Sequence, residues 1–485
     1  MRSFASENIS PDVVAFQFAV RGKIAIVSEE IDNAIKKAKA EGKPNPYPFE
    51  KVVKCNSGNP QLLNQKPLTF VREITSMVEY PPLTEHPELF HADADAVARA
   101  KEIIKATGCN GTTGAYSPSK GLAYVRQTIA RFLEERDNVP MSPEDIYLTD
   151  GASIAIKIVM QLMLSHPLHG IMIPNPQYPL YGACIQQLGG KTCHYNLNED
   201  NYWLPDINDI KEQYEKYQNE GIKIKALVVI NPGNPCGEVL PVDTIKEIIR
   251  FCNEKKICLM ADEVYQENIW TDVPFNSFRK ILATMEPEIA HGLELISFHS
   301  ISKGFYGECG KRGGMFACTN IPEFARLMMY KIISTTLCSN VVGQVVMSII
   351  CNLPKEGDPS YPLFKQERDE ILGSLKRKAE YLCDIFNKCE GMSCNRAAGA
   401  MYLFPRITLP EKFIKECHER HEDPNETYCI EMLKKTGIAV VKGSGFGQKK
   451  GTYHFRIALL PPENEIEEVG KRIQVFHNSF IQQYK

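Results

Sequence analysis

Residues 297–314 read SFHSISKGFYGECGKRGG, and they place Lys303 directly after a run that has the apolar character of a buried strand. Lysine normally lies on the solvated surface of a protein, and a lone lysine is most often just such a surface residue. Lys303, however, lies between a serine-rich strand end and a glycine-rich basic turn. Because ligands collect beyond the carboxyl ends of strands in open α/β sheets, this position indicates a candidate functional site.

Short apolar runs alternate with helical patterns on the N-terminal side of this stretch, from about residue 115 onward. Amphipathic segments such as DTIKEIIRFCNEKK separate most of the runs. Strands that are apolar along their whole length and alternate with helices are typical of a parallel sheet covered on both faces. The sequence therefore predicts an α/β fold with a mainly parallel sheet. Its predicted strands are 145–150 (DIYLTD), 170–176 (GIMIPNP), 225–232 (KALVVINP), 257–263 (ICLMADE) and 293–300 (LELISFHS).

A second, smaller α+β domain is predicted toward the C-terminus. A turn-rich stretch, LPKEGDPSYP at 353–362, is followed by a long charged helical pattern and then by shorter strand-like runs. We predict an N-terminal arm with part of the small domain at 1–110, the large domain that carries the site at 111–360, and the rest of the small domain at 361–485.

The bulk composition argues against several other classes of protein. A net charge of −3 over 485 residues gives no general attraction to nucleic acid or to an anionic membrane. We expect no membrane-spanning helix, because no run of about 18 apolar residues occurs. The 16 cysteines are irregularly spaced and contain no C-x-x-C pair, so they are interpreted as reduced intracellular thiols. With no secretory or transit pattern in the first residues, we expect a cytoplasmic protein.

Three further groups of residues lie at predicted strand ends. The turn at 151–153 leads into an apolar helical pattern, and the free N–H groups at a helix start can bind an anion. The turn at 231–237 (NPGNPCG) is made rigid by its prolines and contains Asn234, a hydrogen-bond donor. Asp262 is an acidic residue that directly follows a strand; taken alone, such a residue is as often a helix N-cap as a functional group. Together with the serines and basic residues around Lys303, these groups predict one ligand site.

Several of these stretches resemble the fold-type-I aminotransferases, which use pyridoxal phosphate. The resemblance rests on SISKGFYGECGKRGG, NPGNPCG, ADEVY and GAYSPSKGLAYVR, and it extends through most of the chain. Within that family, GECGKRGG, PQYPLY and KEGDPSY are similar to the alanine branch. The resemblance implies pyridoxal 5'-phosphate as cofactor and a ping-pong exchange of L-alanine and 2-oxoglutarate for pyruvate and L-glutamate. The chain departs from many relatives in a longer spacing between Lys303 and Arg312, and in Cys236, where many carry threonine.

The resemblance also implies roles for individual residues. Lys303 would form a Schiff base with the cofactor and, once released, carry the proton between the substrate and the cofactor. Its amine must be neutral for this, so we expect surrounding burial and positive charge to lower its pKa. Asp262 would keep the ring nitrogen protonated. Asn234 and Tyr265 would hydrogen-bond the phenolic oxygen, and Tyr178 would stack on the ring.

The remaining positions would bind anions. Arg456, in TYHFRIALL, matches the arginine that holds the substrate carboxylate through two parallel donors, and Gly58 matches the loop whose backbone contacts that carboxylate. Tyr116 matches the residue that reaches the phosphate of the neighbouring subunit, which implies a homodimer with shared active sites. The residues expected to hold the phosphate of their own subunit are Ala152, Ser153, Ser300, Ser302 and Arg312.

Three alternatives remain open from the sequence. The substrate pair could be glutamate and glyoxylate, or a broader set of small amino acids, because nothing identifies the group that binds a distal carboxylate. A lyase on the same scaffold would use the same Lys303 and Asp262. A non-catalytic binding protein is disfavoured, because Lys303, Asp262 and Arg456 are all present. No metal is expected, since the Cys417, His418 and His421 group lies in a charged segment without a second ligand pair.

Overall fold

An eight-stranded sheet forms the centre of the larger part of the molecule, in the order β1-β8-β7-β6-β5-β2-β3-β4. The computed structural model describes residues 9–15, 22–108 and 113–485. Neighbouring strands from β3 through β2, β5 and β6 to β7 are parallel, whereas β8 is antiparallel to both of its neighbours. The strands are β1 (Ile146–Thr149), β2 (His169–Asn175), β3 (Lys191–Asn198), β4 (Leu204–Pro205), β5 (Lys223–Ile230), β6 (Cys258–Asp262), β7 (Leu295–Ser300) and β8 (Gly314–Thr319).

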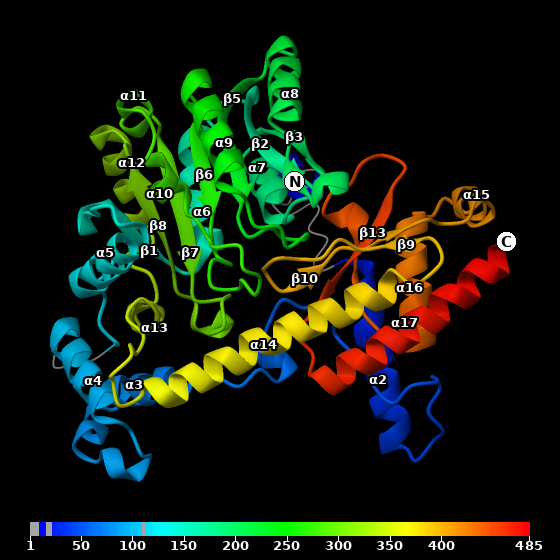
Figure 1. The fold of residues 1–485 in the computed structure, drawn as a ribbon, viewed down its shortest axis with the longest axis horizontal. Coiled ribbons are helices and arrows are strands. Elements are labelled where there is room, and N and C mark those ends of the chain that lie inside the picture. The colour runs from blue at the N-terminus through cyan, green and yellow to red at the C-terminus, as the bar shows by residue number, and fades with distance from the viewer. Residues whose placement is uncertain (1–8, 16–21, 109–112) are drawn as a thin grey trace.

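Helices cover both faces of this sheet (Figure 1). On β5, Leu227 and Val229 pack in the core beneath α9, while Val228 and Ile230 pack in the core beneath α6 and α7. Both faces of each central strand are therefore buried, which explains why the sequence shows continuous apolar runs there. The predicted α/β fold with a mainly parallel sheet is confirmed. The helices of this part are α5 (Ala123–Asp137), α6 (Ala152–Met163), α7 (Leu180–Gln187), α8 (Ile207–Asn219), α9 (Val242–Lys255), α10 (Phe278–Leu282), α11 (Pro287–Ala290), α12 (Glu323–Ser334) and α13 (Val341–Ile350).

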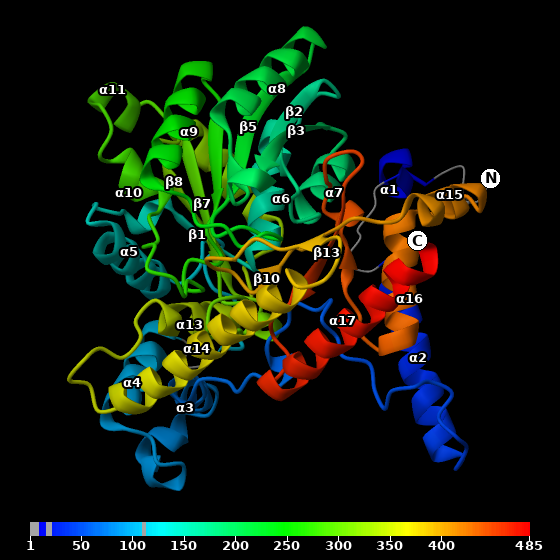
Figure 2. The same cartoon turned by 45° about the vertical axis from the view of Figure 1, so that its right-hand side comes forward.

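A smaller antiparallel sheet with long helices makes up the rest of the chain. Here β13 pairs with β10, β11 and β12, and β9 completes the sheet beside β11. Figures 1 and 2 show α14 and α17 side by side along this sheet. The elements are α2 (Lys23–Ala40), α14 (Tyr361–Phe386), β9 (Met392–Ser393), β10 (Tyr402–Leu403), β11 (Arg406–Ile407), α15 (Glu411–Glu419), α16 (Pro424–Thr436), β12 (Val441–Lys442), β13 (Tyr453–Ala458) and α17 (Glu463–Tyr484).

The N-terminal third of the chain is divided between the two parts. Helix α2 packs against α16 in the small-domain core. Helices α3 (Thr69–Glu79) and α4 (Ala94–Thr107) pack instead with α5, α13 and β1, which belong to the larger part. The short α1 (Pro11–Ala15) lies against α7. The domain boundaries at 110 and 360 stay predictions, although residues 69–107 pack with the large sheet and not with the small one.

Helix α14 belongs to both cores. Phe364 in its first turns packs with α3, α4 and α5, and Leu375 and Ala379 further along pack in the small-domain core. Ile371, between them, contacts both cores. Among the described residues, no helix has both the length and the apolar character that crossing a membrane requires.

A buried carboxylate joins the end of α5 to α10. Asp137, with 1% of its side chain exposed, accepts a hydrogen bond from Ser277 and forms ion pairs with Arg136 and Arg279. The Arg279 side chain is itself only 3% exposed. The arginines hold the pKa of Asp137 below its ordinary value despite the loss of hydration that burial causes. Removing either partner would leave a buried charge unpaired, which strongly destabilises the folded protein.

We predict that Asp137→Ala lowers the free energy of unfolding by about 3–5 kcal/mol, because it leaves buried arginines without their counter-ion. Urea unfolding followed by circular dichroism measures this change. The matched control is Arg250→Ala, which breaks an exposed ion pair with Glu286 and should leave the transition almost unmoved. Equal losses in the two variants would contradict the prediction.

Candidate active site

The carboxyl ends of β5, β6 and β7 and the start of α6 surround a pocket of about 280 Å³. All of the predicted site residues except Arg456 and Tyr116 line it. Arg456 lies directly behind the pocket, in contact with Asn234. Tyr116 lies outside, with its side chain 79% exposed. The residues that line the pocket include Gly58, Ala152, Ser153, Tyr178, Asn234, Asp262, Tyr265, Ser300, Ser302, Lys303 and Arg312.

The amine of Lys303 points across the pocket to the loop before α3. Its Nζ donates a hydrogen bond of 2.8 Å to the carbonyl oxygen of Gly58. Burial lowers the pKa of Lys303, but the nearby Tyr402, Cys309 and Tyr178 raise it, and the resulting pKa lies above the ordinary value. The predicted lowering of this pKa is therefore wrong for the protein without a ligand. The prediction took account of burial and positive charge but not of the tyrosine and cysteine side chains that face the amine.

Asp262, the last residue of β6, is buried and is oriented by a hydrogen bond. It is 4% exposed, and its Oδ2 accepts a 2.7 Å hydrogen bond from the hydroxyl of Tyr181. Burial raises its pKa to about 6, while Tyr181, the Val264 N–H and Lys303 act in the opposite direction. The carboxyl is thus ionised at neutral pH. Tyr181 was not predicted as a site residue, although it lies in the quoted PQYPLY stretch.

A chain of hydrogen bonds joins the two domains behind the pocket. Asn234 donates to the hydroxyl of Tyr265 (3.2 Å) and accepts from Nη1 of Arg456 (3.1 Å). Nη2 of Arg456 donates to the carbonyl oxygen of Asn56 (3.1 Å). Nε of Arg456 is buried and has no hydrogen-bond partner among the described residues. Nη1 and Nη2 each carry a second N–H, so the guanidinium keeps these and the Nε donor for a ligand, and a buried donor is costly to leave unpaired.

Arg312 lies over the first turn of α6. Its Nη2 donates to the carbonyl oxygen of Asp150 (2.8 Å) and its Nη1 to that of Cys309 (3.1 Å). A Cβ on Gly151, the residue before α6, would lie 2.5 Å from Nη2 of Arg312. Glycine is therefore required there, both for this close approach and for its φ of +85°. The free N–H groups of α6, the guanidinium and the nearby serine hydroxyls together form a cradle for an anion.

Tyr402, on β10, is a site residue that the sequence analysis missed. It lines the pocket, it is 1% exposed, and its hydroxyl lies 3.4 Å from that of Tyr265. The guanidinium of Arg456 lies over its ring, 4.1 Å from the ring centre. The only sequence signal was the strand-like run AMYLFPRI, which does not distinguish this tyrosine from one in a core.

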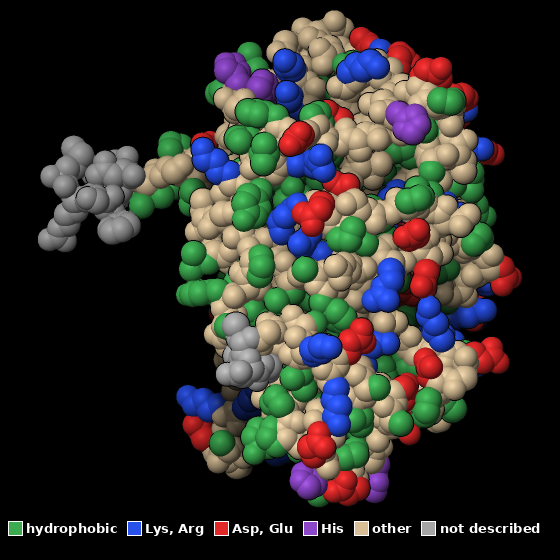
Figure 3. Space-filling view, turned by 90° about the vertical axis from the view of Figure 1, so that its left-hand side faces the viewer, with side chains coloured by type: hydrophobic (Ala, Val, Ile, Leu, Met, Phe, Trp, Pro, Cys, Tyr) green, Lys and Arg blue, Asp and Glu red, His purple; other side chains and the backbone are tan. Residues whose placement is uncertain are grey.

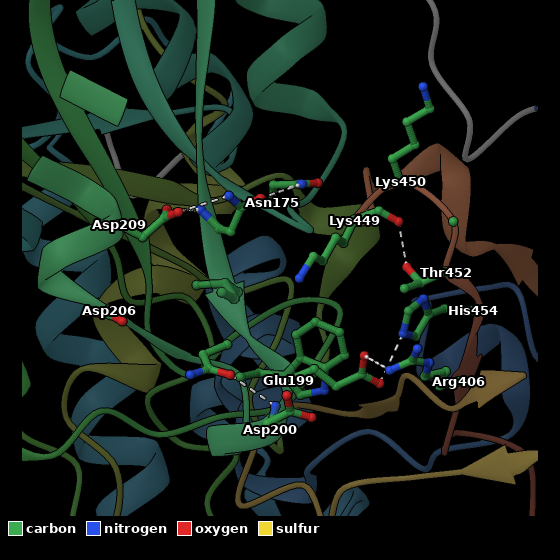
Figure 4. A pocket seen from close by; sticks show the side chains of 15 residues that line it. Asn175, Glu199, Asp200, Asp206, Asp209, Arg406, Lys449, Lys450, Thr452 and His454 are labelled. Atoms are coloured by element: carbon green, nitrogen blue, oxygen red, sulfur yellow. Dashed lines mark hydrogen bonds and ion pairs between the residues drawn. The ribbon is translucent and has the colours of Figure 1, made fainter. Parts of the chain in front are cut away.

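A second, larger pocket of about 530 Å³ lies between the end of β3 and the loop before β13 (Figure 4). Lys449 points into it and Lys450 points away, and both are exposed. Glu199 lies at one side, with Oε1 3.1 Å from Nε2 of His454 and Oε2 3.5 Å from Nη1 of Arg406. His454 is two residues before Arg456 on β13, so Glu199 helps to hold the strand that carries Arg456. The lysine, carboxylate and anion cradle lie in the smaller pocket, which is therefore the candidate active site.

Comparison with known proteins gives a consistent result. The family model described as "Aminotransferase class I and II" matches residues 85–473. The chain is 45% identical to "Probable alanine aminotransferase, mitochondrial" of Dictyostelium discoideum, with 100% of this chain and 90% of the relative covered. It is also 45% identical to "Alanine aminotransferase 2" of Panicum miliaceum, with 99% of each covered. It is 41% identical to "Glutamate--glyoxylate aminotransferase 2" of Arabidopsis thaliana, with 100% of this chain and 98% of the relative covered.

The fold also matches solved structures. An alanine aminotransferase from Pyrococcus furiosus superposes with a TM-score of 0.74 at 22% sequence identity, over 97% of this chain and 100% of the other. The predicted cytoplasmic location is contradicted, because the Dictyostelium discoideum relative that aligns with the whole chain is named as mitochondrial. The first ten residues, from which the cytoplasm was inferred, lie mostly outside the described part of the chain.

The tight packing at Gly58 yields a test of the geometry. A Cβ on this residue would lie 2.3 Å from the hydroxyl oxygen of Tyr402 and 3.2 Å from Nζ of Lys303, but 3.4 Å from the nearest ring carbon of Tyr402. We predict that Gly58→Ala lowers the free energy of unfolding by about 1–3 kcal/mol through overpacking. Adding Tyr402→Phe should recover most of that loss, because it removes the oxygen that clashes.

Thermal unfolding of the wild type, the two single variants and the double variant measures the coupling between these positions. Additive losses in the double variant would show that the hydroxyl of Tyr402 does not lie against Gly58.

Proposed function

Because the chain belongs to the class I and II aminotransferase family, we propose that it exchanges L-alanine and 2-oxoglutarate for pyruvate and L-glutamate. The observation that carries the proposal is the arrangement of Lys303, Asp262 and Arg456 around one pocket, in a chain that aligns over its whole length with alanine aminotransferases. The amine, the carboxylate and the guanidinium are the groups that an amino acid and an aldehyde cofactor require.

The pocket fits pyridoxal 5'-phosphate, the cofactor that the family implies. The cradle of α6, Arg312, Ser300 and Ser302 has the donors that a phosphate needs, and the missing Cβ of Gly151 leaves room for the guanidinium. Asp262, ionised above about pH 6, would pair with the protonated ring nitrogen. When bound, this cofactor supplies an aldehyde for a lysine amine and a ring that accepts the electrons of the bond broken at the substrate Cα.

The protein's own groups would then bind and orient the amino acid. Arg456 is enclosed by the rings of Tyr402 and Phe446, whose centres lie 4.1 and 4.7 Å from its Cζ. These rings keep water away, which strengthens the attraction between the unpaired N–H donors of Arg456 and a substrate carboxylate. Gly58, whose carbonyl oxygen already accepts from Lys303, would lie beside that carboxylate. With the carboxylate fixed there, Nζ of Lys303, in its neutral form, would take the proton from the substrate Cα.

A second candidate reaction is the transfer between glutamate and glyoxylate, or a broader set of small amino acids. A relative of that name is 41% identical over the whole chain, so identity alone does not separate the two. Both reactions would use Lys303, Asp262 and Arg456 in the same roles. The acceptor acid is the property that separates them.

We predict that titration of the purified protein with L-alanine bleaches the visible absorbance of its bound cofactor, and that pyruvate or 2-oxoglutarate restores it. Lys303→Ala should lower the turnover rate by about 10²–10⁴-fold, the usual contribution of a positioned acid or base. Lys331→Ala, on the exposed side of α12, is the matched control and should keep the wild-type rate.

If alanine leaves the absorbance unchanged while glutamate bleaches it and glyoxylate restores it, the substrate pair is glutamate and glyoxylate and the mechanism is kept. A protein that takes up no added pyridoxal 5'-phosphate would contradict the proposed function.

We also propose that the active form is a homodimer with shared sites. Tyr116, which resembles the residue that reaches a neighbour's phosphate, is exposed and lies outside its own pocket. Hydrophobic side chains are spread over the face shown in Figure 3, among charged ones. Tyr80, Leu89 and Leu337 are among the exposed apolar side chains that a partner subunit would cover.

Subunit mixing tests this arrangement. Lys303→Ala and Tyr116→Ala chains, refolded together, would form mixed dimers in which one site has both an intact lysine and an intact tyrosine. We expect random mixing to restore about one quarter of the wild-type activity, above the sum of the two parents. No gain over the parents would show that each chain builds its site alone.

A further inference from the structure

Gly58 lies in the loop by which the chain passes from one domain to the other. Val53, before it, packs in the small-domain core, whereas Leu68 and Phe70, after it, pack in the core of the larger part. The carbonyl oxygen of Gly58 accepts a 2.8 Å hydrogen bond from Nζ of Lys303, which follows the end of β7 in the large sheet. A shift between the domains would therefore move this loop relative to Lys303 unless other contacts hold it.

Two glutamines fasten this loop to the turn that follows the lysine. Nε2 of Gln65 donates a hydrogen bond to the carbonyl oxygen of Phe305 (2.8 Å), and Nε2 of Gln61 donates to that of Gly307 (3.3 Å). The two segments also pack closely, because a Cβ on Gly307, whose φ is +55°, would lie 2.9 Å from Cβ of Pro60. The loop and the turn are therefore joined by hydrogen bonds and by close packing.

An ion pair completes this connection. Nη2 of Arg72, on α3, donates to Oε2 of Glu308 (3.0 Å) and to Oε1 of Gln61 (2.9 Å). The side chain of Glu308 is only 2% exposed, and Arg72 is its only ion-pair partner in the described part of the chain. Oε1 of Glu308 is buried and, among the same residues, has no hydrogen-bond partner. We call the contacts of Gln65, Gln61 and Arg72 with the turn the strap.

We propose that Arg72 and Glu308 are positioning residues for the amino-acid substrate. Their ion pair closes the strap, which holds Gly58 against the amine of Lys303 and keeps the loop with the large sheet when the domains shift. Neither residue lines the pocket, so both act through Gly58. This role deepens the proposed function and rests on it, because the substrate carboxylate is the group that Gly58 would contact.

The proposal gives a role to a stretch that the resemblance left without one. GECGKRGG, at residues 307–314, is similar to the alanine branch and lengthens the spacing between Lys303 and Arg312. Glu308 is its second residue, and its own N–H donates to the carbonyl oxygen of Ile301 (2.8 Å). The longer turn therefore presents a carboxylate, fixed through its backbone, to α3.

Loss of the strap should weaken substrate binding more than it slows the reaction. Gly304, the residue after Lys303, donates its N–H to Oδ1 of Asn268 (2.8 Å), so the lysine is anchored independently of the strap. A contact to the carboxylate that is lost equally in the ground state and the transition state raises KM and leaves kcat almost unchanged. We expect Arg72→Ala to raise the KM for L-alanine about tenfold or more, since a 1 Å misplacement can cost about 10²-fold.

Two further variants separate positioning from stability. Arg72→Ala leaves the buried carboxylate of Glu308 unpaired, which by itself destabilises the fold. Adding Glu308→Gln removes that charge, so thermal stability should recover while KM stays raised, because the strap is still broken. Arg72→Lys should keep the wild-type KM, because one nitrogen of Arg72 makes both bonds and an ammonium group with three donors can replace it.

Arg326→Ala is the matched control. Arg326, on α12, forms an ion pair with Asp145, and its side chain is 34% exposed, as is that of Arg72. It does not line the pocket and has no contact with the strap. This variant should keep both the KM and the kcat of the wild type.

Hydrogen–deuterium exchange of the peptide at 56–65, in the holoenzyme before any substrate is added, measures the strap directly. Exchange should be faster in Arg72→Ala and in the double variant, and should keep the wild-type rate in Arg72→Lys and Arg326→Ala. Wild-type exchange in the double variant, an unchanged KM in Arg72→Ala, or a KM that recovers together with stability would each overturn the proposal. Because exchange needs no substrate, failure of the strap can be told from failure of the proposed function. If glutamate replaces alanine as the amino donor, the same KM comparison is made with glutamate.

Discussion

The candidate site depends on keeping two cations, Lys303 and Arg456, close together away from bulk water. Like charges repel, and each loses hydration, so each must be compensated by fixed acceptors. Lys303 has the carbonyl oxygen of Gly58, and Arg456 has that of Asn56 and the amide oxygen of Asn234. These acceptors come from the loop before α3 and from the turn after β5. The site therefore exists only when the N-terminal loop, the large sheet and the small domain are assembled.

Contacts at the second pocket also hold the small domain, which carries Arg456, against the large domain. Glu199, in the large domain, contacts His454 and Arg406 of the small domain, and its carbonyl oxygen accepts from Asn395 (2.7 Å). Arg456 is thus fixed both by its own hydrogen bonds and by the anchoring of its strand. The contacts of Glu199 and the candidate site therefore both depend on how the two domains are held together.

The sequence predicted those features that local pattern determines. The five apolar runs became strands because burial on both faces demands continuous apolar residues. Strand β3 was missed because alternate side chains of KTCHYNLN are only partly buried, and β8 because it follows directly on the glycine-rich turn. The site positions that resemblance indicated are gathered in or behind one pocket, except for Tyr116. Tyr402 could not be predicted, since its contact with Tyr265 joins residues 137 positions apart. For the same reason the pKa of Lys303 was misjudged.

Helix α14 limits how the two domains can move relative to each other. Because one continuous helix of 26 residues is packed into both cores, a shift of one domain relative to the other must bend this helix or disrupt its packing. Gly373 lies two residues after Ile371, where the helix passes from one core to the other, and a Cβ there would meet only the end of Arg377. Glycine in a helix interior costs about 0.5–1 kcal/mol relative to alanine. Gly373 therefore makes the middle of the helix its weakest point, and bending there would change the angle between the domain that contributes Lys303 and the domain that contributes Arg456.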